Sequence, residues 1–331
     1  DSFKGSLSSM EVEAEIAEVL TEKGADVVSL PMSDGGDGML EAFTKALGGT
    51  IEPVYVHNQM MRRVEAAFGM TADGTAIVEV AQACGLELVK EDERNPMRAT
   101  TYGVGELLSR AVKRGCRNFI IGLGGSGTSD AGIGMLRALV DIFAKGKTFD
   151  DAMQTELGEC RFTLACDVDN PLCGENGAAC VYAPQKGATP QMVEQLDRRA
   201  KLFAEKSALH YGYDRSCCPG AGAAGGLGYA FMQYLGAEMR SGADMLLSLC
   251  RFDDVAKDAD MIITGEGHAD RQTLMGKLPQ KVLQRGQQIG VPVGLGAGRV
   301  DAKEDLLKAG FCFVESVTPD GMSTAEAMKK E

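Results

Sequence analysis

Strand-like and helix-like segments alternate along most of this 331-residue chain, and this alternation restricts its fold more than any other sequence feature. In the last third, apolar runs predict strands at 259–264, 291–295 and 311–316, with helical periodicity over 278–289 and 301–309 between them. Because a helix that connects two parallel strands covers one face of their sheet, this order predicts an α/β fold with a parallel, doubly wound sheet.

The first third of the chain departs from this alternation. A capping box at Ser8 and Glu11 predicts a helix that ends at Gly24, and the apolar run Asp26–Leu30 predicts a short strand after it. Between residues 50 and 81, three β-rich runs with short links predict antiparallel hairpins. The chain is long enough for about two domains, and one of them is expected to be discontinuous, with the hairpin region and the middle third inserted between the chain ends.

Charge and composition exclude several classes of function. The 34 Lys and Arg residues against 47 Asp and Glu give a net charge of −13, which argues against binding to nucleic acid or anionic lipid. The ten cysteines form no CxxC pair and the three histidines have no familiar zinc spacing, so we expect free thiols in a reducing compartment, the cytoplasm. With no signal peptide and no membrane-spanning run, the sequence favours a protein that handles a small ligand.

One Gly-rich loop, GGSGTSD at 124–130, stands between an apolar run and a helical segment. Backbone N–H groups in such a loop can bind an anion, so we predict that residues 124–129 bind phosphate, with tight helix–strand packing as the alternative. Read loosely, Gly122, Gly124 and Gly127 match the dinucleotide pattern GxGxxG, and Asp141 lies near the place of a ribose-binding acid. A nicotinamide-dependent dehydrogenase of a small hydroxy acid is therefore an alternative function. The Walker GxxxxGK[ST] motif is absent from the sequence.

Acidic residues follow three of the apolar runs. They are Asp34 in MSDGGDG, Asp167 and Asp169 in CDVDNP, and Glu266 and Asp270 in TGEGHAD. Because the carboxyl ends of strands in an α/β sheet converge on the ligand crevice, these carboxylates can hold Mg²⁺ or act as a general base. Each loop alone is equally typical of a turn or a helix cap. Three such loops together favour a metal and phosphate site.

Basic residues are sparse in the same kind of loop. Lys4 and Lys277 are the better candidates for neutralising a phosphate or a carboxylate, whereas Lys186 is equally compatible with a solvated side chain. Arg299 follows the strand predicted at 291–295. A single histidine in a polar loop, such as His268, more often makes a local hydrogen bond than it acts as a base.

Seven segments of the chain together resemble the bacterial type of glycerate kinase. They recur in order from Asp1 to about Arg299 and read DSFKGSLS, PMSDGGDG, RNP…TTYGVGE, GLGGSGTSDAGIGML, ACDVDNPLCGENGAACVYAPQKGAT, GAGAAGGLG and TGEGHADRQTLMGK. The resemblance implies ATP- and Mg²⁺-dependent phosphorylation of D-glycerate, with the 2-hydroxyl as the expected acceptor and 2-phosphoglycerate as the product. His268 and Ala269 stand where the family usually has Arg and Ile.

The same resemblance implies two α/β domains around a cleft. One is a Rossmann-like domain with a parallel sheet, built from residues 1–55 and 255–331. The other is an inserted mixed α/β domain with antiparallel strands, residues 56–254.

Roles for individual residues follow from this resemblance and from the chemistry of the loops. We predict catalytic roles for Lys4, Asp34, Asp169 and Asp270, substrate binding by Ser6, Lys277 and Arg299, nucleotide binding by Gly124, Gly125, Ser126 and Gly127, and metal binding by Asp167 and Glu266. The expected partners are D-glycerate and ATP, and a homodimer is compatible with the sequence. A non-catalytic sugar-acid-binding protein is the other alternative function, and the spacing of the carboxylates does not identify the general base.

Overall fold

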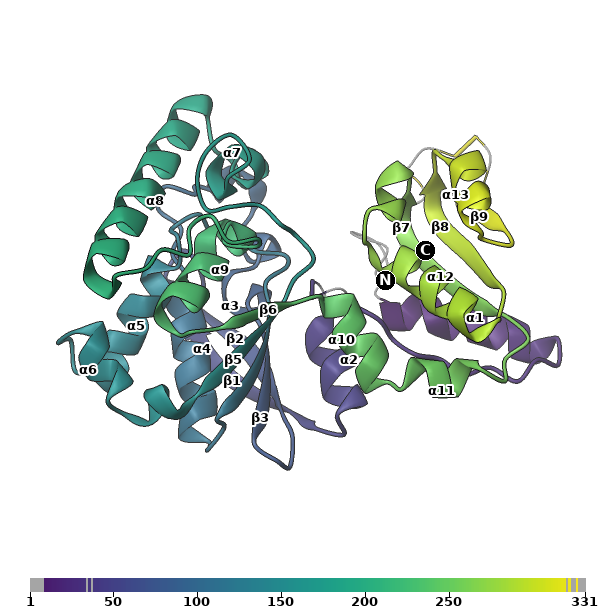
Figure 1. The fold of residues 1–331 in the computed structure, drawn as a ribbon, viewed down its shortest axis with the longest axis horizontal. Helices are drawn as coiled ribbons and strands as arrows, with labels where there is room; N and C mark the ends of the chain where they lie inside the picture. Colours follow the sequence, from purple (N-terminus) through teal and green to yellow (C-terminus); the bar gives the residue numbers. More distant parts are fainter. Residues whose placement is uncertain (1–8, 34, 37, 320, 323–325, 327–331) are drawn as a thin grey trace. The chain divides into compact units, whose positions relative to one another are not determined.

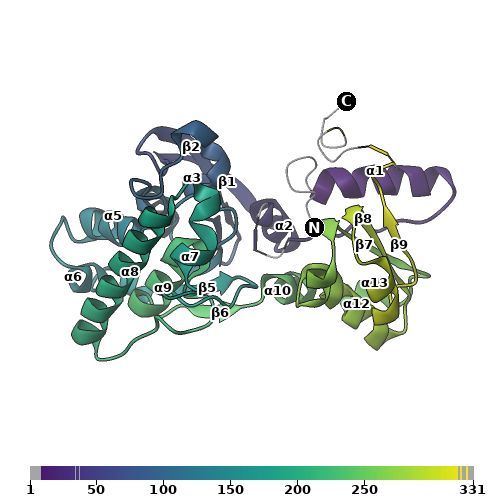
Figure 2. The ribbon, with the colours of Figure 1, turned by 90° about the horizontal axis from the view of Figure 1, so that it is seen from above.

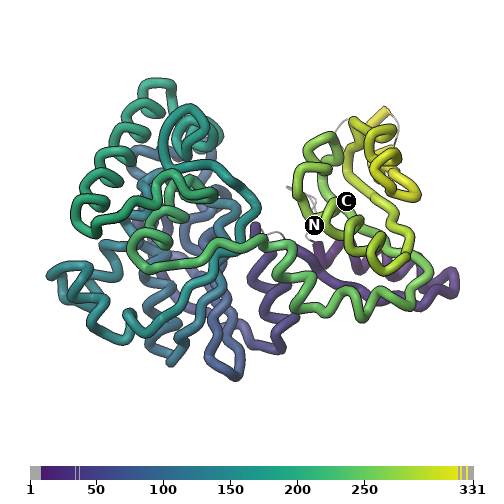
Figure 3. Tube along the Cα trace, in the orientation of Figure 1, coloured from purple at the N-terminus to yellow at the C-terminus, as the bar shows by residue number. Residues whose placement is uncertain are grey.

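The structure is a computed structural model that describes residues 9–33, 35–36, 38–319, 321–322 and 326. Internal contacts divide the chain into two compact units. The first contains the described residues up to Ala42 and those from Gly242 onward, and the second runs from Phe43 to Ser241. In Figure 3 the purple and the yellow segments of the tube belong to the first unit, and the blue and teal segments belong to the second.

A six-stranded mixed sheet forms the centre of the second unit, in the order β1-β2-β3-β4-β5-β6. The strands are β1 (Thr50–His57), β2 (Arg63–Met70), β3 (Thr75–Glu79), β4 (Asn118–Gly122), β5 (Arg161–Ala165) and β6 (Glu238–Arg240). The first two pairs are antiparallel and the remaining three are parallel. The hairpins predicted between residues 50 and 81 are therefore confirmed, and so is the α/β fold class.

Helices follow the strands of this unit, as Figure 1 shows. They are α3 (Ala81–Cys84), α4 (Tyr102–Lys113), α5 (Ile133–Phe143), α6 (Phe149–Met153), α7 (Ala178–Tyr182), α8 (Pro190–Tyr211) and α9 (Ala223–Tyr234). The long helix α8 begins where Thr189 Oγ1 accepts a hydrogen bond from the Met192 N–H, with Pro190 in the first turn, and it ends at Gly212 with φ +76°. These are the usual start and stop signals of a helix, so its bounds were predictable.

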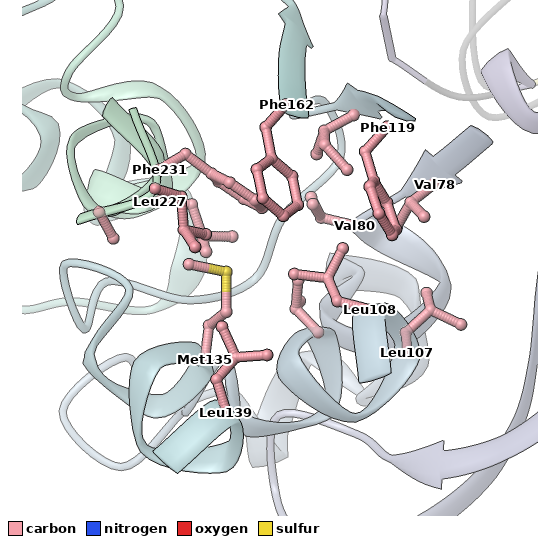
Figure 4. Close-up of a cluster of buried hydrophobic side chains, with 14 of the residues drawn as sticks. Val78, Val80, Leu107, Leu108, Phe119, Met135, Leu139, Phe162, Leu227 and Phe231 are labelled. Atoms are coloured by element: carbon pink, nitrogen blue, oxygen red, sulfur yellow. The ribbon is translucent and has the colours of Figure 1, made fainter. Parts of the chain in front are cut away.

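Aromatic and aliphatic side chains of β3, β4 and β5 pack against α4, α5 and α9 to form the core of this unit (Figure 4). Phe119 stacks on Phe162 with a centroid distance of 4.9 Å, and Phe162 contacts Phe231 of α9 at 5.7 Å. Met135 and Leu227 are fully buried in the same cluster. Because the loops after β4 and β5 leave this rigid core directly, the core holds them in place.

The first unit contains a parallel sheet of three strands, β7 (Ile262–Ala269), β8 (Val293–Val300) and β9 (Val314–Ser316). Its helices are α1 (Ser9–Glu22), α10 (Gly242–Leu249), α11 (Phe252–Ala256), α12 (Leu278–Ile289) and α13 (Lys303–Ala309), while α2 (Met39–Ala46) spans the boundary between the units. Figure 2 shows α12 and α13 on one side of this sheet and α1 on the other. Among the described residues, no helix has the length and apolar character needed to cross a membrane.

The strand predicted at Asp26–Leu30 is wrong. These residues form neither helix nor strand, and the Val28 side chain is 67 % exposed. A strand is stabilised by a hydrogen-bonded neighbour and by burial of one face, and this apolar run has neither in the described structure. The helix before it is confirmed over the described residues, whereas Ser8 of the predicted capping box lies outside them.

Candidate active site

Three of the predicted site residues meet around one threonine at the end of β7. The Glu266 carboxylate, only 6 % exposed, accepts a hydrogen bond from Thr273 Oγ1 at 2.5 Å. Its second oxygen, Oε2, lies 3.5 Å from Lys277 Nζ. The Asp270 N–H donates to Thr273 Oγ1 at 3.0 Å. The structure thus connects Glu266 to Lys277 by an ion pair and to the Asp270 backbone through Thr273.

Local sequence explains how this cluster is built. Asp270 caps the short helix η5 (Arg271–Leu274), and its Oδ1 accepts a hydrogen bond from the Gln272 N–H at 2.7 Å. Lys277 then occupies the N-cap of α12, where the positive end of the helix dipole adds to the charge of its ammonium group. The half-buried Asp270 carboxylate, held by a backbone N–H, therefore lies only a few residues before the N-terminus of α12, where the helix dipole and Lys277 favour an anion.

Arg299, which is also a predicted substrate-binding residue, lies near the end of β8. Its Nε donates to Asp301 Oδ1 at 2.9 Å, and His268 Nε2 pairs with Asp301 Oδ2 at 2.8 Å. These two partners lower the pKa of the Asp301 carboxyl, the Arg299 hydrogen bond most of all. His268 thus makes a local hydrogen bond, the interpretation that its sequence context favours.

Five other predicted residues either lie outside the described residues or follow β5 in the second unit. Lys4, Ser6 and Asp34 belong to the undescribed residues, so their roles stay predictions. Asp167 and Asp169 come directly after β5 and are exposed. Their loop is held at Asn170, whose side chain accepts a hydrogen bond from Tyr182 Oη at 2.6 Å and donates one to a backbone carbonyl at 2.8 Å.

The glycine loop after β4 packs closely against residues 84–86. Leu86 N–H donates to the Gly125 carbonyl at 2.8 Å, and Gly127 N–H donates to the Cys84 carbonyl at 2.7 Å. A Cβ on Gly127 would lie 3.2 Å from the Leu86 Cα, so this position favours glycine because the two backbones come so close. Gly124 is half-buried and Gly125 is exposed. The loop is therefore tightly packed at Gly127, whereas its backbone is accessible to solvent at Gly125.

Lys186 is buried against this loop, so a solvated side chain is the wrong interpretation. It is 3 % exposed, and its Nζ donates to Ser126 Oγ at 3.0 Å and to the Thr128 carbonyl at 2.7 Å. Burial lowers the pKa of Lys186 to about 8. The nearby Cys84 thiol is also buried, which raises its pKa to about 12 and keeps it neutral.

A second network that sequence reasoning missed joins the end of the glycine loop to the start of α4. Asp130 accepts hydrogen bonds from the N–H groups of Thr101, Gly132 and Gly134 at 2.8 to 3.1 Å and from Thr101 Oγ1. Burial nevertheless raises the pKa of Asp130. This region also lines a pocket of about 330 Å³, to which Arg137 adds a guanidinium group. The sequence signal was present in the separate motifs TTYG and GTSD.

We expect Asp130→Asn to destabilise the second unit by about 2–3 kcal/mol, because the amide keeps one acceptor and turns an NH₂ group toward backbone donors. Urea unfolding followed by circular dichroism measures this change, and Asp92→Asn in the exposed 3-10 helix η2 (Glu91–Glu93) is the matched control. Equal midpoints for the two variants would show that the Asp130 network does not hold these segments together.

Among the residues with a described position, no group of three Asp, Glu, His or Cys side chains is placed to hold a metal ion. The dinucleotide alternative fits less well. Asp141 lies inside α5, where it accepts hydrogen bonds from Arg137 Nε and Tyr102 Oη.

The fold and these clusters define an α/β protein with a glycine loop after one strand and with carboxylates near strand ends, a combination suited to phosphoryl transfer. The model of the glycerate kinase family matches residues 1–331. The glycerate kinase of Haemophilus influenzae is 40 % identical over 326 residues, which cover 93 % of this chain and 86 % of that protein. The glycerate 2-kinase of Escherichia coli is 39 % identical over 320 residues, covering 88 % and 82 %.

A solved structure is similar over the same length. The crystal structure of a glycerate kinase 2 candidate from Salmonella typhimurium LT2 matches with a TM-score of 0.78 and 35 % identity, covering 99 % of this chain and 92 % of that one. The chain belongs to the glycerate kinase family, so the resemblance noted in the sequence is confirmed. The protein is therefore a kinase, a phosphotransferase, rather than a dehydrogenase or a binding protein without activity.

Proposed function

We propose that this protein transfers the γ-phosphoryl group of ATP to the 2-hydroxyl of D-glycerate in a Mg²⁺-dependent reaction. The observation that carries this choice is the 39 % identity to the Escherichia coli glycerate 2-kinase across 88 % of the chain. In the reaction the 2-hydroxyl oxygen bonds to the γ-phosphorus, the bond from that phosphorus to the bridging oxygen breaks, and ADP leaves. The hydroxyl proton passes to a carboxylate.

The cluster at the end of β7 supports a role in this transfer. Asp270 offers a half-buried carboxylate fixed by the Gln272 N–H, as a group that orients or deprotonates a hydroxyl requires. Lys277 is held by Glu266 and can meet the carboxylate of glycerate or the transferred phosphoryl group. Arg299 on the adjacent strand, with the predicted Lys4 and Ser6, adds positive charge and donors for the same anions.

The nucleotide is assigned to the loop Gly124, Gly125, Ser126 and Gly127. The exposed backbone of Gly125 supports this assignment, because an approaching phosphate meets no side chain there. The loop is fixed by its hydrogen bonds to residues 84–86, so its shape is set before a ligand arrives.

Mg²⁺ would be held by oxygen ligands after β5 together with the phosphates of ATP. Asp167 and Asp169 fit because both are exposed and carry the hard oxygen atoms that this cation prefers. Glu266 would add a ligand only if its ion pair with Lys277 broke, since one carboxylate oxygen accepts from Thr273 and the other faces that lysine. When bound, the cation neutralises the negative charge of the phosphates.

Two further expectations belong to the same proposal. The ten cysteines are all free thiols, which supports a location in the reducing cytoplasm. A homodimer remains a prediction that analytical ultracentrifugation would check.

Steady-state kinetics test the proposal directly. The purified protein with ATP and Mg²⁺ is expected to release ADP only when D-glycerate is present, and chelation of the cation is expected to stop the release. L-glycerate and D-lactate are the matched controls, because the first reverses the stereocentre and the second lacks the 3-hydroxyl. Nucleotide turnover that does not depend on D-glycerate would contradict the proposed substrate.

A further inference from the structure

Lys186 is the one fully enclosed lysine that we find among the described residues, and the proposed mechanism gives it no task. It lies at the end of the short helix η4 (Pro184–Lys186), and its ammonium group reaches a loop some 60 residues earlier in the chain. Its two hydrogen-bond acceptors there, Ser126 Oγ and the Thr128 carbonyl, are both neutral oxygen atoms.

Within the described part of the chain, this ammonium group makes no direct ion pair, and the Asp130 carboxylate acts on it only from a greater distance. The titratable and charged groups that act on it are Cys84 and Asp130. The Cys84 thiol is neutral because its pKa is raised to about 12. The Asp130 carboxylate is engaged by Thr101, Gly132 and Gly134, whereas the direct contacts of the ammonium group are with Ser126 and Thr128. A buried cation whose direct hydrogen bonds go only to neutral acceptors costs folding free energy.

A bound anion would compensate for the cost of burying the Lys186 charge. Ser126 and Thr128, the residues that Lys186 holds, lie at and just beyond the end of the segment Gly124–Ser126. The ammonium group therefore fixes the loop from its buried side, while the backbone of Gly125 is exposed to solvent. A positive charge behind a loop of backbone N–H groups adds to their attraction for phosphate, and it acts through an interior that screens it less than water does.

We propose that Lys186 is the positioning residue and the buried counter-charge of a phosphate subsite at Gly124–Ser126, where it supports the phosphates of the nucleotide. The inference rests on the proposed function, because the ligand of the loop is taken to be ATP. It assigns Lys186 to nucleotide affinity rather than to glycerate binding or to the chemical step.

Loss of the Lys186 charge is expected to raise the KM for ATP without changing the KM for D-glycerate. Lys186→Met keeps the length and apolar stem of the side chain and removes the charge together with its two hydrogen bonds. We expect the KM for ATP to rise about 10- to 100-fold, which is the range for one lost charge-assisted contact, with the KM for D-glycerate unchanged within about twofold. Lys206→Met on α8, which removes an exposed lysine of the same unit, is the matched control and should change neither constant.

A pH profile separates a charge effect from a packing effect. Because the pKa of Lys186 is lowered to about 8, the unliganded protein loses this charge as the pH rises through that value. The wild-type KM for ATP should therefore increase above about pH 8, while the Lys186→Met variant should be equally weak at every pH in the range. ATP itself does not change its charge there, since its last phosphate proton dissociates below neutral pH.

Calorimetric titration with Mg²⁺-free ATP gives a readout that does not depend on turnover. Binding should take up protons above about pH 8 in the wild type, because an adjacent anion favours the charged ammonium group. If Lys186→Met does not fold, the wild-type profile and the proton uptake still decide the question.

The outcomes distinguish this inference from the proposed function. A wild-type KM for ATP that stays flat through pH 8 without proton uptake would overturn the role of Lys186 while leaving the kinase assignment intact. So would a Lys186→Met variant that weakens only the binding of D-glycerate. If the wild type shows no glycerate-dependent turnover but binds ATP with the expected pH dependence, the proposed substrate fails and the phosphate subsite stands.

Discussion

Replacing Asp270 by Asn is expected to lower kcat by at least about 100-fold, and up to about 10⁴-fold if the carboxylate accepts the hydroxyl proton. Asn is nearly the same size and can still cap η5 by accepting the Gln272 N–H, so the fold should be retained. The loss would then come from the missing negative charge. Stopped-assay kinetics on the purified variant, with its Tm from calorimetry, measure both quantities.

Asp305→Asn is the matched control for this variant. Asp305 belongs to the same unit and pairs with Arg271 at 2.7 Å, so the substitution removes a carboxylate of similar exposure outside the cluster around Thr273. We expect its kcat to stay within about twofold of the wild type, as is usual for an exposed ion pair. If Asp270→Asn were as active as this control, Asp270 would be a helix cap and the general base would have to lie elsewhere.

Lys4→Ala is expected to lower kcat/KM by about 100-fold, equivalent to about 3 kcal/mol of lost transition-state stabilisation. The sequence places this lysine in DSFKGS, just before the helix α1 that begins at Ser9. There its charge and the positive end of the helix dipole would act on the same anion, either the carboxylate of glycerate or the transferred phosphoryl group.

The control for Lys4 lies at the other end of the same helix. Lys23 follows α1 and is exposed, so Lys23→Ala removes one positive charge without approaching the predicted anion. Its kinetic constants should match those of the wild type. A folded Lys4→Ala variant that also matched the wild type would place Lys4 on the surface with no part in the reaction.

Much of the fold was predictable because its signals are local. The helix α8 carries its own N-cap at Thr189 and its own stop at Gly212, and the three strands after residue 50 are joined by short links. The strand expected at Asp26–Leu30 shows the limit of such signals. An apolar run becomes a strand only if a neighbouring strand pairs with it, and sequence periodicity does not report the neighbour.

The candidate site was likewise predictable only where its contacts are local in the sequence. Glu266 and Asp270 were predicted together because they stand in one loop motif, and Lys277 was predicted separately as a basic residue a few positions later; the turn chemistry of η5 brings the three together. The burial of Lys186 could not be predicted, since its partners Ser126 and Thr128 are about 60 residues distant in the chain. The Asp130–Thr101 network is likewise a contact between separate motifs.

The central claim, transfer of phosphate from ATP to the 2-hydroxyl of D-glycerate, is tested most directly by proton-coupled phosphorus NMR of the reaction mixture. A phosphate on the 2-oxygen is attached to a carbon with one hydrogen, so we expect a new phosphomonoester doublet that grows as the γ-phosphate signal of ATP declines. A triplet would instead report phosphate on the 3-oxygen, whose carbon carries two hydrogens, and would contradict the proposed acceptor. The absence of any new phosphomonoester signal in the presence of active, folded protein would contradict the proposed reaction itself.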